Sequence, residues 1–138
     1  MLNNLTNIPG LDHIAIVVES IENGLKFYEK SLGLKVLIIE TVESQGVKVA
    51  KLELNNTHIE LLEPLAANNS IGRYLAKHGQ GLHHICLSVN DVKQWLNTLD
   101  ENKVCLINRE PVTGSQNRKV AFVHPKSTNG VLLELSQV

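Results

Sequence analysis

Two segments of this chain match each other in residue type, one near the start of each half. Each half also ends on a second pair of matching segments. Residues 11–18 read LDHIAIVV, and residues 82–89 read LHHICLSV. Each half then closes on a short run with one acid among aliphatic residues, at residues 58–62 and again at residues 131–135. A match in residue type, order and spacing predicts a duplicated structural module.

The duplication also repeats two side chains that are suited to metal binding. His13 and His84 are 71 residues apart, and Glu60 and Glu134 are 74 residues apart. Each copy therefore supplies one imidazole and one carboxylate. A duplicated module of this kind can bring four ligand side chains to one point.

The bulk composition excludes several classes of protein. A net charge of −1 argues against a nucleic-acid-binding protein, because phosphate binding requires a surplus of Lys and Arg. The apolar run at residues 14–18 is far too short to span a membrane. Two cysteines without metal-type spacing are typical of free thiols in a reducing compartment. We therefore expect a cytoplasmic protein and a single domain over residues 1–138.

The first half, residues 11–65, has the pattern of a βαβββ unit. A β-rich apolar run is followed by Ser20 as a helix N-cap, helical spacing of apolar residues, and Gly33 as a C-cap glycine. Three further strands are predicted at residues 36–42, 47–54 and 57–62. Residues 66–80 are predicted to form a linker with a short helix.

The second half, residues 81–137, repeats this order. A strand at residues 82–89 is followed by a helix capped by Asn90 or Asp91, and further strands are predicted at residues 104–108, 119–124 and 130–136. We therefore predict an α+β fold with two tandem βαβββ modules, in which an open, curved β-sheet has its helices on the outside.

Strand alternation predicts which side chains share a sheet face. His13 shares a face with Ala15, and His84 shares a face with Cys86. These neighbours are small and leave room beside each imidazole, whereas the opposite faces carry β-branched residues suited to the core. Imidazole nitrogens and carboxylate oxygens suit a divalent ion such as Co, Mn, Ni, Fe or Zn. Taken alone, either His could also be a structural residue held by hydrogen bonds, and either Glu could be an exposed residue of a half-solvated strand.

Five stretches in order point to a known family: residues 11–16, 60–65, 81–86, 124–127 and 130–135. With the duplicated His/Glu pattern, they resemble the vicinal oxygen chelate (glyoxalase-like) superfamily and, within it, the methylmalonyl-CoA epimerase family. The resemblance covers nearly the whole chain. It implies a partly open β-sheet barrel around a metal site, a CoA thioester substrate and a homodimer.

The resemblance also implies a set of metal ligands. The first-strand ligand matches His13, and the fourth-strand ligand, Gln or Glu in different members, matches Glu60. The second His of the His83–His84 pair matches the next ligand, and the last-strand ligand matches Glu134. The implied cofactor is one divalent ion per chain, with cobalt favoured and Mn, Ni or Zn possible.

The implied reaction is epimerisation of (2R)- and (2S)-methylmalonyl-CoA through a thioester enolate. A proton must leave one face of C2 and another must arrive on the opposite face, so two acid/base groups are expected. The resemblance gives Glu134 one of these roles. Many relatives have a second Glu directly before Gln-Gly, where this chain has Ser44; Glu43 is one position earlier. Glu43 reaches the site if the strand ends in a bulge or irregular turn, and otherwise it is a solvated hairpin residue.

Two lysines are weaker candidates for substrate binding. Lys126, in the sequence His-Pro-Lys-Ser, is placed to hold an anionic substrate, and Lys119 is placed to meet CoA phosphates. A polar surface loop explains either residue equally well.

Two other functions fit the same scaffold. A glyoxalase-type lyase or isomerase would use the same two-His, two-Glu set, and a metal-free small-molecule binding protein would use none of it. A metal-dependent dioxygenase fits less well, because its usual facial triad has one carboxylate and this chain offers two.

Overall fold

The computed structural model describes residues 8–138, which form two compact units. One unit contains His13–His83, and the other contains His84–Val138 together with the short segment that ends at Asp12. Residues 1–7, part of the single domain predicted from the sequence, lie outside the described residues. Each unit is described below by itself.

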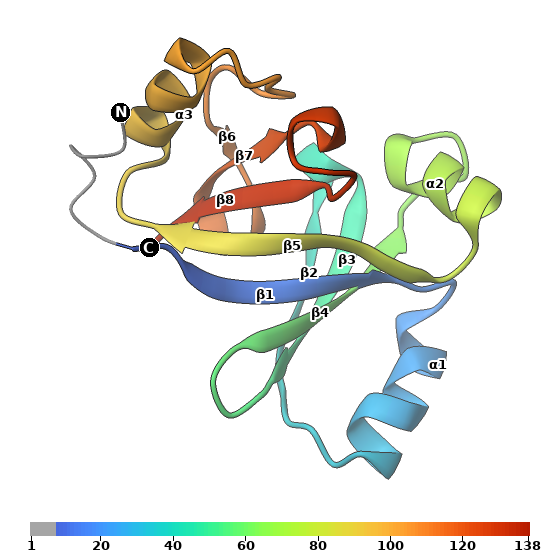
Figure 1. Ribbon diagram of the computed structural model, residues 1–138. Coiled ribbons are helices and arrows are strands. Elements are labelled where there is room, and N and C mark those ends of the chain that lie inside the picture. Colours follow the sequence, from blue (N-terminus) through green and yellow to red (C-terminus); the bar gives the residue numbers. More distant parts are fainter. Residues whose placement is uncertain (1–7) are drawn as a thin grey trace. The chain divides into compact units, whose positions relative to one another are not determined.

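The unit that contains His13–His83 follows the predicted order of strand, helix and three strands, with a further helix after them (Figure 1). Its elements are β1 (Gly10–Val17), α1 (Ile21–Leu25), β2 (Val36–Val42), β3 (Val47–Glu53), β4 (His58–Pro64) and α2 (Ser70–His78). β1 pairs with β4 in parallel, β4 pairs with β3 antiparallel, and β3 pairs with β2 antiparallel.

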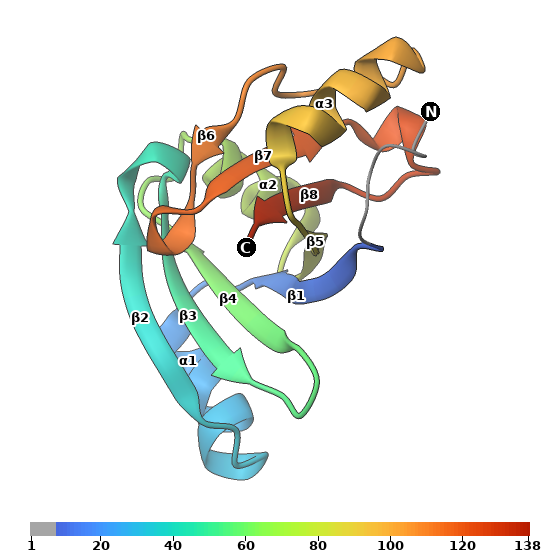
Figure 2. The same cartoon turned by 90° about the vertical axis from the view of Figure 1, so that its left-hand side faces the viewer.

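The second unit repeats this arrangement. Its elements are β5 (Gly81–Val89), α3 (Val92–Glu101), β6 (Val112–Thr113), β7 (Lys119–Val123) and β8 (Leu133–Gln137). β5 pairs with β8 in parallel, β8 with β7 antiparallel, and β7 with β6 antiparallel, while α3 packs on β7 and β8 (Figure 2). Order and direction of pairing are therefore the same in both modules, which confirms the predicted α+β fold of tandem βαβββ modules.

The helix predicted between Ser20 and Gly33 is present but is of two kinds. The Ser20 hydroxyl accepts a hydrogen bond from the Asn23 N–H and caps α1. From Lys26 to Ser31 the helix widens to π-type, and the Leu32 N–H then donates to the Phe27 carbonyl. The widening changes which residues face the sheet, so that Phe27 and Leu32 are more than half exposed.

One predicted strand is wrong. In the segment of residues 104–108, only Leu106 forms a β-bridge, with Val123. Other backbone groups of this segment form isolated hydrogen bonds instead of a strand ladder. For example, the Ile107 N–H donates to the Phe122 carbonyl. The two residues of β6 occupy the position of the second strand instead. The last strand also begins later than predicted, at Leu133.

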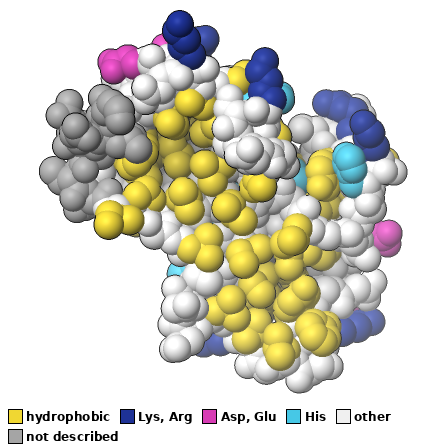
Figure 3. Space-filling view, in the orientation of Figure 1, with side chains coloured by type: hydrophobic (Ala, Val, Ile, Leu, Met, Phe, Trp, Pro, Cys, Tyr) yellow, Lys and Arg dark blue, Asp and Glu magenta, His cyan; other side chains and the backbone are white. Residues whose placement is uncertain are grey.

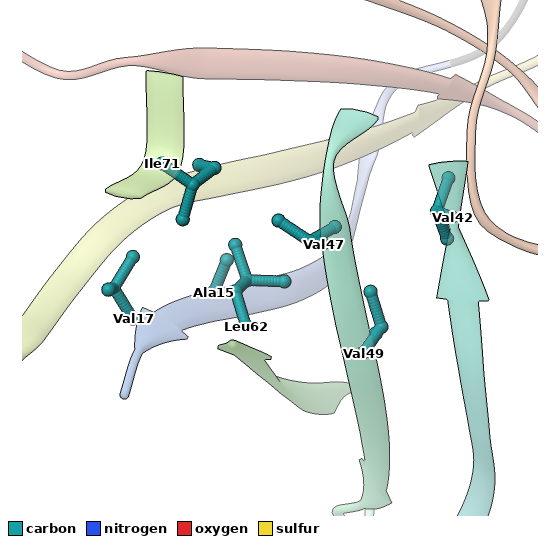
Figure 4. Close-up of a cluster of buried hydrophobic side chains, with 7 residues drawn as sticks. All are labelled: Ala15, Val17, Val42, Val47, Val49, Leu62 and Ile71. Atoms are coloured by element: carbon teal, nitrogen blue, oxygen red, sulfur yellow. The ribbon is translucent and has the colours of Figure 1, made fainter. Parts of the chain in front are cut away.

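Both faces of the first sheet contribute to the core. On the face away from His13, Ile21 of α1 packs with Val18 and Leu61. The His13 face also carries a buried cluster, with side chains from β1, β2, β3, β4 and α2 directed toward one another (Figure 4): Ala15, Val17, Val42, Val47, Val49, Leu62 and Ile71. The His13 face therefore supplies core side chains as well as the opposite face, and α2 covers part of it.

In the second unit the core lies under α3. Trp95 and Leu96 of this helix pack with Val89, Ala121 and Leu135 of the sheet. The Asp91 carboxylate caps α3 by accepting a hydrogen bond from the Gln94 N–H, as one of the two predicted caps. Among residues 8–138, no helix has both the length and the apolar character needed to cross a membrane.

Candidate metal centre

In the first unit, His13 and Glu60 form a buried pair. Ala15 of β1 lies in register with Glu60 of β4, so His13, two residues before Ala15, is on the same face as the carboxylate. The Nδ1 atom of His13 lies 3.2 Å from Oε2 of Glu60. Both residues are 5% exposed. A carboxylate buried in mid-strand requires a partner of this kind.

The second unit contains the equivalent pair, His84 and Glu134. Cys86 of β5 lies in register with Glu134 of β8, as Ala15 does with Glu60. The Nε2 atom of His84 lies 2.9 Å from Oε1 of Glu134, and the two residues are 7% and 6% exposed. The ring of Phe122 meets the His84 imidazole edge-on, with the ring centres 5.4 Å apart. Each module therefore positions its His and Glu by the same strand register.

His83 lies on the opposite face from His84, as the alternation predicts. Its ring packs edge-on against Tyr74 of α2 at a centroid distance of 4.7 Å. The Tyr74 hydroxyl donates to the Leu82 carbonyl. Of these two adjacent histidines, His84 is the buried one, and it contacts Glu134.

The donor set in the two modules fits a divalent metal ion. Each pair offers a ring nitrogen and a carboxylate oxygen about one hydrogen bond apart. Ligands of these types suit borderline divalent ions such as zinc or cobalt. The two pairs use different ring nitrogens, Nδ1 in His13 and Nε2 in His84; either nitrogen of an imidazole can bind a metal.

Glu43 lies directly after the end of β2 at Val42. Residues Glu43–Gln45 form one turn of 3₁₀ helix, and Glu43 is exposed. Gly46 closes the turn in the left-handed conformation, with a φ of 68°, which glycine adopts without strain. The Asn69 amide donates to the Gly46 carbonyl at 2.9 Å and fixes this turn to the start of α2. The irregular turn required for Glu43 to leave the strand alternation is present.

The two candidate lysines are on the surface. Lys126 is exposed in the 3₁₀ turn Pro125–Ser127, and its backbone N–H donates to Nδ1 of His124. Lys119 is exposed at the start of β7. The neighbouring Arg118 instead forms an ion pair with Asp12 at 2.8 Å.

Sequence reasoning missed Lys51, which is 6% exposed. It lies on β3 directly opposite Glu60 of β4. The alternation of Val47, Val49 and Lys51 was the signal, because it places the lysine on the face of the two buried valines.

Comparison with known proteins gives the same family over most of the chain. Residues 12–122 match the model of the Glyoxalase/Bleomycin resistance protein/Dioxygenase superfamily. The chain is 46% identical to the uncharacterized protein YqjC of Bacillus subtilis, over 92% of this chain and 91% of that protein. It is 38% identical to the ethylmalonyl-CoA/methylmalonyl-CoA epimerase of Cereibacter sphaeroides, over 93% of this chain and 97% of the enzyme.

A similar solved structure is that of a methylmalonyl-CoA epimerase in complex with methylmalonyl-CoA and an ammonium ion. It shares 33% sequence identity with this chain, with a TM-score of 0.90 over 95% of both chains. The sequence matches, the shared fold and the repeated His/Glu pairs agree. The chain belongs to the Glyoxalase/Bleomycin resistance protein/Dioxygenase superfamily and, within it, to the methylmalonyl-CoA epimerase family of racemases and epimerases.

Proposed function

We propose that this protein interconverts (2R)- and (2S)-methylmalonyl-CoA, with one divalent metal ion per chain. The observation that carries the proposal is the buried His–Glu pair at the same register position of each module, in a chain of the methylmalonyl-CoA epimerase family. A protein of this fold that did not bind a metal ion for catalysis would not need a buried His–Glu pair in each module.

The proposed ligands are His13 and Glu60 from the first module and His84 and Glu134 from the second. Cobalt is the favoured ion, and Mn, Ni or Zn would suit the same nitrogen and oxygen donors. When bound, the ion supplies Lewis-acid stabilisation of the enolate oxygen, worth several kcal/mol of barrier. The mixed set of four side chains leaves coordination positions for the substrate.

Glu134 and Glu43 are the proposed acid/base pair. One carboxylate removes the C2 proton from one face, and the other delivers a proton to the opposite face. The 3₁₀ turn at Glu43–Gln45 supports the role of Glu43, since strand alternation no longer fixes the direction of its side chain. Burial of Glu134 beside His84 keeps its carboxylate in place.

We infer that the substrate is a CoA thioester, because a related epimerase has been solved with methylmalonyl-CoA. Lys126 is proposed to help hold the anionic substrate, and Lys119 to meet the phosphates of CoA. The exposure of both side chains is consistent with contact to a ligand that is partly in solvent.

A homodimer is the proposed assembly. Apolar side chains gather on the face shown in Figure 3, and such surface patches commonly mark protein interfaces. On β2, which pairs only with β3 within the described residues, Leu37 and Ile39 are 39% and 46% exposed.

Both Cys86 and Cys105 are free thiols, which supports the proposed cytoplasmic location.

The test of the function is proton NMR of (2R)-methylmalonyl-CoA in heavy water. The substrate is incubated with cobalt-loaded protein, which is removed before the spectrum is recorded. We expect the C2–H signal to disappear far faster than in buffer. The (2S) epimer should behave in the same way. Protein dialysed against a chelator should lose this activity and regain it when cobalt is restored. A C2–H signal that persists with both epimers would contradict epimerisation.

Replacing Glu43 with Gln should separate proton exchange from inversion. We expect epimerisation to fall by roughly 100-fold or more, the low end of the effect of an acid/base group. Exchange of C2–H should persist for the one epimer whose proton faces Glu134, and it should be lost for the other. Chromatographic separation of the epimers gives the inversion rate, and NMR gives the exchange rate. Unchanged inversion would move the second acid/base role to another group, such as a water molecule.

A further inference from the structure

Phe122 lies beside the second His–Glu pair, but the proposed function gives it no role. It is in register with Glu134 across β7 and β8, and β8 lies between β7 and β5. Residues directly opposite each other on antiparallel strands share a face, so the phenyl ring is on the face of Glu134. Its centroid lies 5.4 Å from that of the His84 imidazole, and the two ring planes are 87° apart. The two rings therefore meet on the face that carries the glutamate.

The core of this unit does not account for an aromatic residue at this position. Ala121, the preceding residue of β7, packs with Trp95 and Leu96 of α3. Strand alternation directs Phe122 to the other face, where it is half-buried. Contact with the imidazole, and not packing under α3, is therefore what a large apolar side chain provides here.

Both backbone groups of Phe122 bond to the segment before β6. Its N–H donates to Oδ1 of Asn108 at 2.8 Å, and its carbonyl accepts from the Ile107 N–H at 2.9 Å. Both groups thus face away from β8. In an antiparallel ladder, a pair of this kind shares no hydrogen bonds, and its side chains lie closer together than those of a hydrogen-bonded pair.

The Asn108 side chain takes the place of a strand residue at this edge of β7. In the segment of residues 104–108, Leu106 bridges to Val123 but no continuous ladder follows. A part-buried backbone N–H requires an acceptor, and the Asn108 amide oxygen supplies one to Phe122. The segment that fails to form a strand therefore still fixes the backbone of Phe122.

An imidazole on a strand needs a neighbour that fixes the plane of its ring. The torsion about the Cβ–Cγ bond of histidine is broad. Rotation about this bond would move Nε2 of His84 away from Oε1 of Glu134, which lies at 2.9 Å. A second ring packed at nearly a right angle restricts that rotation, and such aromatic pairs are favourable beyond the area that they bury.

We propose that Phe122 is a positioning residue that holds the His84 imidazole with Nε2 directed at Glu134 and the proposed ion, and that Asn108 acts through Phe122. The inference rests on the proposed function, since His84 is one of the proposed ligands. Phe122 and Asn108 form no bond to the ion in this arrangement. They act through the orientation of its ligand.

The experiment measures cobalt affinity by titration calorimetry and the visible absorption of bound cobalt, which depends on the geometry of its ligands. Phe122→Leu removes the ring and keeps an apolar side chain. We expect cobalt affinity to fall about 3- to 10-fold, the change that corresponds to the energy of an aromatic pair, and the visible spectrum to change. Phe122→Tyr keeps the ring and should restore both properties.

A double-mutant cycle tests the role of Asn108. Asn108→Leu alone should weaken cobalt binding and alter the spectrum in the same direction. In the Phe122→Leu background it should cause no further loss, because residues that act through one contact are not additive. Asn108→Asp keeps the acceptor oxygen and should keep the spectrum of the unaltered protein. Thermal unfolding of the metal-free variants checks their folding, and Asn108→Leu carries the test if Phe122→Leu does not fold.

Phe27→Leu is the matched control, since it makes the same change at the other phenylalanine of the chain, which is 56% exposed. Cobalt affinity and spectrum should be unchanged in this variant. If Phe122→Leu altered neither property, or if the losses at Phe122 and Asn108 were additive, the proposal would be overturned and the proposed function would stand. Failure of the unaltered protein to bind cobalt would overturn both.

Discussion

Replacing Glu134 with Gln should eliminate epimerisation, with a fall in kcat of at least about 1,000-fold. Three losses combine in this variant. The amide cannot accept the C2 proton, which alone is worth roughly 100- to 10,000-fold, and it is a weaker metal ligand than a carboxylate. Because Glu134 makes the 2.9 Å contact with Nε2 of His84, the imidazole also loses its charged partner. The measurement is the rate of inversion from each epimer at saturating cobalt.

A control in the same module distinguishes this effect from a general change in charge. Glu101 is exposed at the end of α3, and Glu101→Gln should keep the full rate. If Glu134→Gln retained more than a tenth of the activity with cobalt bound, the carboxylate would be a structural group, and the proton acceptor would lie elsewhere.

Replacing His84 with Ala should weaken cobalt binding by more than about 100-fold. Loss of a residue that only supports a metal ligand typically costs 10- to 100-fold in affinity, and loss of the ligand itself should cost more. The same change leaves the buried Glu134 without its imidazole partner, so the stability of the fold should be followed by thermal unfolding. Cobalt affinity is measured by titration calorimetry or from the visible absorption of the bound ion.

The neighbouring residue provides a matched control. His83→Ala removes an imidazole one position away, which packs on Tyr74 on the opposite side of the strand. Cobalt affinity should be unchanged in this variant. Equal cobalt affinities in the two variants would show that the imidazole of His84 is not a ligand.

Much of the fold could be predicted because its signals are local. The strand Val36–Val42 was predicted with the bounds that the structure gives, since a capping glycine before it and a Gln-Gly turn after it delimit the apolar run. The cap at Ser20 was predicted for the same reason, and Asp91 was one of the two predicted caps of the second helix, with Asn90. Strand alternation alone predicted that His83 and His84 lie on opposite faces of their strand.

The parts that failed depend on contacts between distant residues. Residues 104–108 have strand-like composition, but only Leu106 finds a bridging partner, and a strand requires a continuous ladder. The buried cluster on the His13 face was not predicted. Ile71 of α2 packs there, and the sequence of β1 does not indicate where a later helix packs.

The candidate site also has a part that could be predicted and a part that could not. The repeat spacing predicted that each module supplies one His and one Glu, and the strand register places Glu60 beside His13 and Glu134 beside His84. The burial of Lys51 was not, because it requires β2 and β4 on both sides of β3. The conformation at Glu43 depends on Asn69, 26 positions further along the chain, which holds the Gly46 turn.

We propose that the two modules share one ion, and the number of cobalt ions bound per chain decides whether they do. Titration calorimetry on the metal-free protein should give one cobalt ion per chain. Both His13→Ala and His84→Ala should remove that single binding event. Two ions per chain, with one retained in each variant, would show that each His–Glu pair acts alone, and no binding at all would contradict a metal centre.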